Sequence, residues 1–230
     1  MKIYLIPNLL YEQTQDLIPT KAHEALLACT YYLVENERTA RRFIGSLKLG
    51  IDIRSLHFFI LDKKTSTQQL QAIFHQIPQN SAVGIISEAG VPCVADPGSL
   101  AVDFAHRKGW EVIPISGPSS ILLALMGSGF NGQLFTFRGY LPIKAPDAIK
   151  KLREIEKEAR TGHTQIFMET PFRNNKLFEL ILQNCGKDVK LCVASTITAP
   201  DQFIKTKVIG HWKKSDVDLH KKPTIFLLGT

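Results

Sequence analysis

The sequence predicts an α/β protein built from two α/β domains. In the first half, short apolar runs that suit buried strands alternate with segments of helical periodicity, a pattern typical of a parallel sheet with right-handed crossovers. A Gly- and Pro-rich stretch at 116–120 interrupts this rhythm. In the second half, the last two apolar runs have no helix between them, which indicates a mixed sheet. We therefore expect a first domain over residues 1–116, with a mainly parallel sheet, and a second over residues 117–230.

The elements of the first half follow from apolar spacing and from capping residues. Strands are expected at 2–6, 31–34, 56–61, 82–86 and 110–115, and helices at about 20–29, 38–47, 66–77 and 99–108. Thr20 is a candidate cap for the first helix, and Thr65 or Ser66 for the third. Gly109 is expected to end the fourth helix.

The second half begins with a short apolar helix and continues with a less regular alternation. Helices are expected at 121–126, 147–160 and around 177–181, and strands at 134–138, 164–168, 189–194, 203–209 and 224–228. Residues 139–142 are predicted to form a turn after the first of these strands. The helix at 147–160 mixes basic and acidic residues, which predicts an exposed helix with charge pairs.

Composition places the chain among ordinary globular proteins. Its 230 residues are 44% hydrophobic, and no apolar run approaches the roughly 18 residues of a membrane span. The first residues predict a strand and not a signal peptide, so we expect a cytoplasmic protein with no membrane partner. The four cysteines have no metal-ligand spacing, which predicts buried free thiols and no metal. A net charge of +7 fits an anionic partner such as nucleic acid, and equally fits a solvated basic surface.

The loop at 87–98 is the most unusual feature of the chain, because it is long, rich in Gly and Pro, and follows a buried strand. It carries two acids, Glu88 and Asp96. In open parallel sheets, ligands bind at the carboxyl ends of strands, where such loops lie. Three other strand exits, at 7–8, 116–120 and 169–173, also carry unusual residues. Together they predict a cleft for a small molecule.

Several common chemistries are disfavoured, because the loops lack the motifs that they use. There is no Gly-x-Gly-x-x-Gly fingerprint for a dinucleotide and no phosphate-binding loop with Gly-Lys-Ser/Thr. There is also no Gly-x-Ser-x-Gly nucleophile elbow. Residue types alone thus lead to a two-domain α/β protein with a small-molecule cleft.

Four ordered motifs resemble those of the tetrapyrrole methylase superfamily, in particular its ribosomal RNA small subunit methyltransferase I branch. Residues 90–98 read Gly-Val-Pro-x-x-x-Asp-Pro-Gly, and residues 114–120 read Pro-Ile-Ser-Gly-Pro-Ser-Ser. Phe-Arg-Gly-Tyr-Leu-Pro at 137–142 and Glu-Thr-Pro-Phe-Arg at 169–173 stand where the branch has Phe-x-Gly-Phe-Leu-Pro and Glu-Ser-Pro-His-Arg. The resemblance implies two α/β domains, with S-adenosylmethionine bound in the cleft between them.

The resemblance also implies which residues hold the cofactor. Backbone at Gly90 and Val91 approaches it, and the helix that begins at Ser120 offers free amides to an anionic edge. The full set of positions that match the family is Pro7, Gly90, Val91, Val94, Ser120, Ile121, Met168, Ala194 and Thr224. For each there is a structural alternative, such as a turn glycine, an ordinary helix cap or a core residue.

A hydroxyl acceptor would have to lose its proton during methyl transfer, so a base is required. Glu88 is the first candidate, followed by Glu169 and Glu37, with helix capping or surface pairing as the alternative role. Asp96 is expected to brace its loop by accepting backbone amides. Three arginines are candidates for phosphate contacts or for surface ion pairs, namely Arg38, Arg138 and Arg173.

The branch implies methylation of a ribose 2′-hydroxyl in RNA of the small ribosomal subunit, and the family implies a homodimer. The sequence departs from the branch at 7–10, which lacks the glycine of Pro-x-Gly-Asn-Leu, and at 35–39 and 195–199. The helical tail usual in the branch beyond the last strand is also missing from the sequence. Two alternatives therefore remain: a methylase of a small tetrapyrrole, and a non-catalytic relative that binds S-adenosylmethionine.

Overall fold

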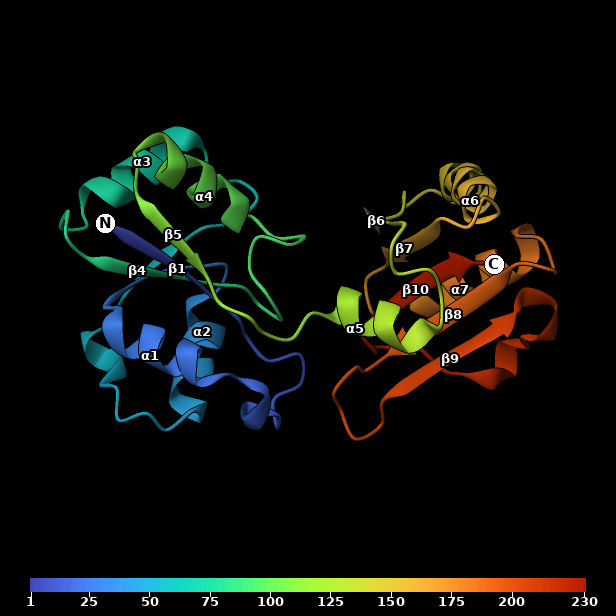
Figure 1. The fold of residues 1–230 in the computed structure, drawn as a ribbon, viewed down its shortest axis with the longest axis horizontal. Helices are drawn as coiled ribbons and strands as arrows, with labels where there is room; N and C mark the ends of the chain where they lie inside the picture. The colour runs from blue at the N-terminus through green and yellow to red at the C-terminus, as the bar shows by residue number, and fades with distance from the viewer. The chain divides into compact units, whose positions relative to one another are not determined.

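The computed structural model describes residues 1–230, which form two compact units, Met1–Ser119 and Ser120–Thr230 (Figure 1). The sequence placed a boundary after residue 116, and the structure divides the chain after Ser119. Each unit has its own five-stranded sheet, with helices packed against it. The predicted class, two α/β domains, is confirmed.

The first unit is a parallel sheet with crossover helices. Its elements are β1 (Lys2–Ile6), α1 (Thr20–Ala28), β2 (Tyr31–Val34), α2 (Glu37–Ser46), β3 (His57–Ile60), α3 (Thr67–His75), β4 (Ala82–Ile86), α4 (Gly98–Arg107) and β5 (Glu111–Pro114), with 3-10 turns η1 (Gln15–Leu17) and η2 (Ile53–Ser55). The strand order is β3-β2-β4-β1-β5, and all four pairings are parallel. The strand that precedes the long loop, β4, is therefore the centre of the sheet.

Helices cover both faces of this sheet, α1 and α2 on one and α3 and α4 on the other (Figure 1). On the first face Leu26 and Phe43 are buried, and on the second Leu70 and Phe104 are buried. Each such side chain contributes about 1.5–3 kcal/mol by leaving water, so these two layers hold the sheet rigid beneath its loops.

Helix ends follow the sequence signals with one exception. Ser66 caps α3 in a capping box with Gln69, and Gly109, with φ of +66°, follows α4 and bonds back to it. The prediction that Thr20 caps α1 is wrong. The helix already begins at Thr20, and Pro19, in an extended conformation, holds the capping position without a side-chain bond.

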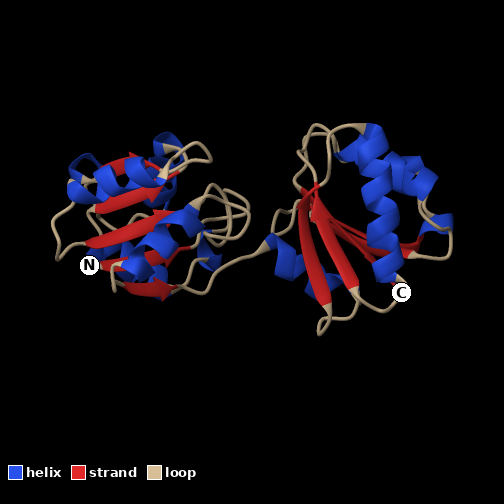
Figure 2. Ribbon diagram, turned by 90° about the horizontal axis from the view of Figure 1, so that it is seen from above, coloured by secondary structure: helices blue, strands red, loops and turns tan.

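The second unit has a mixed sheet, as predicted. Its elements are α5 (Ser120–Ser128), β6 (Phe135–Tyr140), α6 (Ala145–Ala159), β7 (Thr164–Met168), α7 (Asn174–Asn184), β8 (Lys190–Ser195), β9 (Phe203–Val208), η3 (Ile209–His211), η4 (Lys214–Asp216) and β10 (Thr224–Gly229). The order is β6-β7-β10-β8-β9, in which only β6 and β7 pair in parallel. Strands of this sheet lie side by side in Figure 2, and the central strand of the pairing order, β10, is buried along its whole length.

The turn predicted at 139–142 does not form, and only bends at residues 143–144 follow the strand. Strand β6 continues through Tyr140, and its register against β7 shifts between Phe137 and Tyr140. Gly139, at this bulge, has φ of +67°, a value that glycine adopts without strain and most other residues do not. The bulge lets the strand run on where a tight turn was expected.

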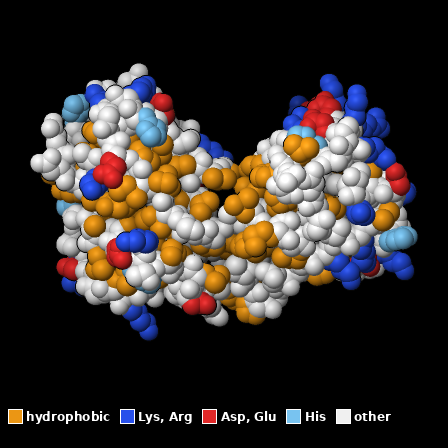
Figure 3. Space-filling model, viewed as in Figure 1, with side chains coloured by type: hydrophobic (Ala, Val, Ile, Leu, Met, Phe, Trp, Pro, Cys, Tyr) orange, Lys and Arg blue, Asp and Glu red, His pale blue; other side chains and the backbone are white.

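The charge pattern of α6 produces the exposed helix that was predicted. Lys151 pairs with Glu154 and Arg160 with Glu156 along the helix. Figure 3 shows these basic and acidic side chains gathered over α6. Exposed pairs of this kind contribute little stability, so the cluster is mainly a solvated surface.

Candidate functional site

The first part of the candidate site lies where β1 and β4 end. The connections from these two parallel neighbours run to opposite sides of the sheet, because β1 leads by α1 to β2 and β4 leads by α4 to β5. Such a point, where the direction of strand order reverses, is the usual ligand crevice of an open α/β sheet. The loops at 7–12 and 87–97 both begin there.

Asn8 ties these two loops together. Its backbone exchanges hydrogen bonds with Gly90, with N–O distances of 2.8 and 3.2 Å, in an isolated bridge. Its side-chain Nδ2 donates to the carbonyl oxygen of Ser87 at 2.8 Å and to that of Glu88 at 3.2 Å. Asn8 is buried, so these bonds are protected from water and fix the start of the long loop.

A third strand exit joins them, the one that follows β5. A Cβ atom on Gly117 would lie 2.1 Å from the Cβ of Pro7, so these two exits are packed in direct contact. A Cβ on Gly90 would lie 3.0 Å from the carbonyl oxygen of Pro118, and Gly90 itself has φ of +71°. Both glycines are therefore required for the close approach of the three loops.

Asp96 braces the long loop, as the sequence predicted. Its Oδ1 accepts hydrogen bonds from the amides of Cys93 at 2.8 Å and of Gly98 at 2.7 Å. Its Oδ2 is buried and has no partner. Burial raises the pKa of the Asp96 carboxyl, and the two amides oppose that rise. Val94, on the same loop, exposes 46% of its surface, which leaves an apolar side chain at the loop's outer face.

Glu88 stands at the start of the loop and is exposed. Thr39, in the first turn of α2, donates its hydroxyl hydrogen to Glu88 Oε1 over 2.5 Å. Burial raises the pKa of the neighbouring Glu35 carboxyl, and the negative charges of Asp96 and Glu88 raise it further. Sequence reasoning did not single out Glu35, although its position directly after β2 was the available signal.

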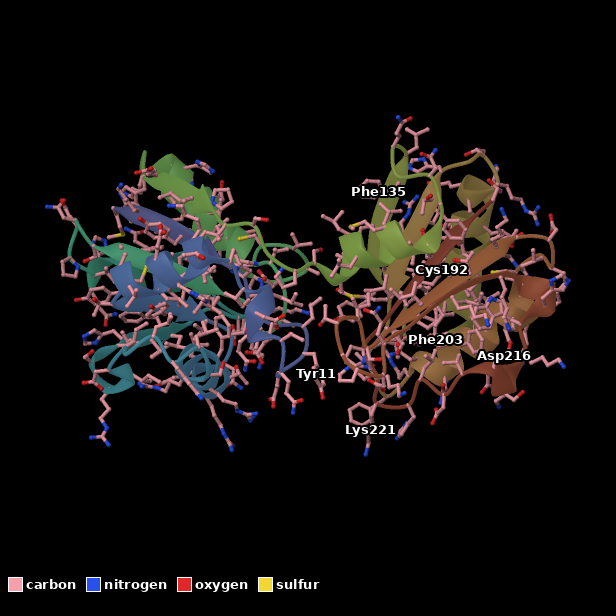
Figure 4. All side chains as sticks on the ribbon, turned by 60° about the horizontal axis from the view of Figure 1, so that its bottom comes forward. Tyr11, Phe135, Cys192, Phe203, Asp216 and Lys221 are labelled. Atoms are coloured by element: carbon pink, nitrogen blue, oxygen red, sulfur yellow. The ribbon has the colours of Figure 1, made fainter.

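A cavity of about 250 Å³ opens beside Glu88 within the first unit. The loop after β1 and the helix α2 form its walls. The residues that line it are Asn8, Leu9, Leu10, Tyr11, Glu12, Thr39, Arg42, Phe43, Ser46, Glu88 and Ala89. Tyr11, labelled in Figure 4, comes from the loop that follows β1. Sequence reasoning identified neither the cavity nor the part that Asn8 and Thr39 play in it.

In the second unit, the three strand-end residues among the expected cofactor positions lie together. Met168 on β7 and Ala194 on β8 are both in register with Ile225 of the central strand β10. Thr224, the first residue of β10, donates its hydroxyl hydrogen to Ser195 Oγ at 3.0 Å. The sheet therefore brings Met168, Ala194 and Thr224 to one end, where three adjacent strands begin or finish.

The helix α5 begins at Ser120, followed by Ile121. Ser120 is its first helical residue, so the capping position belongs to Ser119. The first amides of a helix lack intrahelical partners, so the end of α5 at Ser120 and Ile121 is the end that suits an anionic group.

Glu169 and two of the three arginines predicted to contact phosphate are engaged in ion pairs. Glu169 is 8% exposed, pairs with Arg173 and accepts a hydrogen bond from the amide of Thr170 at 2.6 Å. Arg138 pairs with Glu158 and donates to Gln165. Arg38 has no carboxylate within 4.0 Å, so it is the one of the three arginines that keeps its charge unpaired.

No group of three or more His, Cys, Asp or Glu side chains is arranged to hold a metal ion. Of the cysteines, Cys29, Cys185 and Cys192 are buried free thiols, and Cys93 is partly buried. No helix is both long and apolar enough to span a membrane.

Comparison with known proteins places this architecture in a family. The sequence model of the tetrapyrrole (corrin/porphyrin) methylases matches residues 14–211. "Ribosomal RNA small subunit methyltransferase I" of Vibrio cholerae is 27% identical over 214 residues, which cover 92% of this chain and 71% of that protein. The protein of the same name from Thermotoga maritima is 32% identical over 186 residues, covering 79% of this chain and 80% of that protein. The Buchnera aphidicola protein of that name is matched over 59% of its length.

Solved structures show the same fold at lower identity. The methyltransferase CobJ superposes with a TM-score of 0.65 at 17% identity, over 100% of this chain and 93% of that one. A uroporphyrin-III C-methyl transferase from Thermus thermophilus, complexed with S-adenyl homocysteine, superposes with a TM-score of 0.61 at 17% identity and covers 100% of this chain.

The fold and the sequence relatives together define a methyltransferase of two α/β units, with long loops at the carboxyl ends of a parallel sheet. The chain belongs to the tetrapyrrole methylase family. The resemblance that the sequence motifs indicated, to the S-adenosylmethionine-dependent methylases of this family, is thus confirmed.

Proposed function

We propose that this protein transfers a methyl group from S-adenosylmethionine to RNA of the small ribosomal subunit, at a ribose hydroxyl. The observation that carries the proposal is the similarity to proteins named ribosomal RNA small subunit methyltransferase I, with 25–32% identity in V. cholerae, Escherichia coli and T. maritima. The net charge of +7 supports an anionic partner. The structures of CobJ and of the uroporphyrin-III enzyme share the fold, but at 17% identity they do not favour a tetrapyrrole substrate.

The loops of the first unit fit a cofactor that must be approached closely by backbone. Gly90 has the left-handed φ and the crowded Cβ position that exclude a side chain, and Val91 and Val94 follow it on a loop braced by Asp96. Pro7 is held against Gly117 at the adjoining exit. In the second unit, Ser120 and Ile121 offer amides, and the strand ends at Met168, Ala194 and Thr224 offer a largely apolar edge. We assign the cofactor to these nine residues.

S-adenosylmethionine, when bound, supplies an activated methyl group, so the chain's own tasks are positioning and proton removal. Glu88 is the base that we assign, because it is exposed beside a cavity and held by Thr39. There its carboxylate orients the acceptor hydroxyl and takes up the hydroxyl proton. Glu169 fits this role less well, since Arg173 and the Thr170 amide already engage its carboxylate. It remains a second candidate.

Two experiments test the proposal. Calorimetric titration with S-adenosylhomocysteine should give micromolar binding, lost in Gly90→Val. The control is Gly50→Ala, at a glycine that also has positive φ but no atom within 4 Å of its Cβ position. Incubation with tritiated S-adenosylmethionine should then label isolated small ribosomal subunits. Labelling of a uroporphyrinogen-type tetrapyrrole and not of the subunits would mean that the substrate is a tetrapyrrole. Binding of S-adenosylhomocysteine without labelling of any acceptor would favour the non-catalytic alternative.

We also propose that the protein is a cytoplasmic homodimer. Apolar side chains along the edge strand β6 and just after it are exposed, with Phe135 at 39% and Ile143 at 75%, and such groups suit a protein interface. Sedimentation equilibrium should give twice the chain mass of 25.8 kDa. Fractionation of cells should place the protein with the ribosomes, as a ribosomal substrate requires.

A further inference from the structure

The cavity beside Glu88 has two chemically different walls. Leu9, Leu10 and Phe43 supply apolar surface, whereas Thr39 and Glu88 supply a hydrogen-bonded polar edge. Its volume of about 250 Å³ lies just below the range of roughly 300–1,000 Å³ that is usual for small-molecule pockets. A cavity of this size and mixture suits a single ring with a hydroxylated sugar.

Tyr11 adds an aromatic side chain to the same cavity. It has no ring partner among the aromatic contacts of the chain. Nucleic-acid bases that are not paired stack on aromatic side chains, and this contact does not depend on the identity of the base. Tyr11 follows directly on residues 7–10, which lack the glycine of the family's first loop.

Positive charge lies along the same helix that walls the cavity. Arg38 and Arg42 are four residues apart on α2, so they share one face of the helix. Arg38 has no ion pair. Arg42 pairs with Glu12 across 2.6 Å, but both side chains are largely exposed, so a phosphate can displace that carboxylate at little cost. Arg41 is committed elsewhere, to Glu37 and to the ring of Phe58.

We propose that this cavity is the acceptor subsite: it receives one unpaired ribonucleoside of a single-stranded RNA, whose flanking phosphates lie on Arg38 and Arg42. The base stacks on Tyr11 against the apolar wall, and a ribose hydroxyl faces Glu88. This assignment rests on the proposed function and adds to it the side of the first unit along which the RNA runs.

The test uses the full chain and a fluorescent single-stranded RNA hexamer of mixed sequence, with the DNA hexamer of the corresponding sequence beside it. Arg38→Ala and Arg42→Ala should each weaken RNA binding and flatten the slope of log Kd against log salt by about 0.7. Tyr11→Ala should weaken binding roughly tenfold. Glu88→Gln should reduce the preference for RNA over DNA, because only RNA presents the 2′-hydroxyl.

Arg54→Ala is the matched control, since Arg54 is an exposed arginine of the same unit, outside the cavity and without an ion pair. Every variant should still bind S-adenosylhomocysteine, which shows that it is folded. RNA affinity that falls no further in Arg38→Ala, Arg42→Ala and Tyr11→Ala than in Arg54→Ala would overturn the subsite. If the parent still methylates RNA in that case, the proposed function stands. If the parent neither binds nor methylates RNA, both the acceptor subsite and the proposed function are refuted.

Discussion

Thr39 and Glu88 are 49 residues apart in the chain, yet the Thr39 hydroxyl donates to Glu88 Oε1 across 2.5 Å. The bond joins the first turn of α2 to the loop that follows β4. It restricts a carboxylate that would otherwise move freely at an exposed position. Since rates of proton transfer depend on placement as well as on pKa, this bond makes Thr39 a positioning residue for the base that we assign.

We expect Glu88→Gln to lower kcat for methyl transfer by roughly 10²–10⁴-fold, because the amide cannot accept the acceptor's proton. Thr39→Val should lower kcat less and leave binding of S-adenosylhomocysteine unchanged. Single-turnover kinetics with tritiated cofactor measure both effects. Glu111→Gln is the control, because Glu111 is an exposed residue of β5 whose ion pair with Lys2 lies on the surface. A Glu88→Gln enzyme as fast as the parent would mean that another group is the base.

Gly117→Ala should destabilise the first unit by about 1–3 kcal/mol, the usual effect of overpacking. The new methyl group would lie 2.1 Å from the Cβ of Pro7, so the exits of β1 and β5 would have to separate. Urea unfolding followed by circular dichroism measures the loss. Gly132→Ala is the matched control, with no atom within 4 Å of its Cβ position, and should stay within about 0.5 kcal/mol of the parent.

Asp96→Ala should destabilise the loop by about 2 kcal/mol, because the amides of Cys93 and Gly98 lose their acceptor. Asp96→Asn keeps an acceptor oxygen in that place and should be tolerated. If the asparagine variant were as damaging as the alanine variant, the charge and not the acceptor would be holding the loop.

The stability of Asp96→Asn should also differ from that of the parent in its dependence on pH. Burial raises the pKa of Asp96 in the folded chain above its ordinary value of 3.8, so folding favours the protonated form. The stability that this gives is complete below pH 3.8 and is lost as the pH rises through the higher, folded-state pKa. Thermal unfolding should therefore show Asp96→Asn gaining on the parent from about pH 4 upward. A difference that is constant with pH would contradict this.

The thiols should be slow to react in the folded protein. Burial raises the pKa values of Cys29 and Cys185 to about 12, and that of Cys93 also to about 12, with the charge of Asp96 contributing. Only the thiolate is nucleophilic, and at pH 8 almost none is present. Ellman's reagent should titrate four thiols in guanidinium but few in buffer, with Cys93 the first to react. Rapid reaction of several thiols in buffer would show that the units open easily.

Sequence reasoning was most successful where local periodicity decides the outcome. The strands and helices of the first unit, the mixed second sheet and the bracing role of Asp96 all follow from residue patterns within short windows. The bulge at Gly139 was missed, because the glycine suits a turn and a bulge equally well.

Pairings between distant loops could not be predicted in this way. Nothing in the sequence near Asn8 indicates that its side chain reaches Ser87, nor that Thr39 is the partner of Glu88. Likewise the three candidate arginines look alike in sequence, and only the folded chain shows that Arg138 and Arg173 are neutralised by carboxylates. These contacts depend on loop paths, which are set by packing over the whole unit.

The position of β10 in the second sheet has a consequence for synthesis on the ribosome. All strands of the first sheet lie within the first 114 residues, so that unit can fold while the rest of the chain is still being made. In the second unit the central strand is the last one translated, and until Thr224–Gly229 emerges, β7 and β8 have no partner between them. During synthesis the chain therefore carries a folded first unit together with an incomplete second sheet, which is prone to aggregate. A stall before Thr224–Gly229 emerges would expose two unpaired apolar strands to chaperones and proteases.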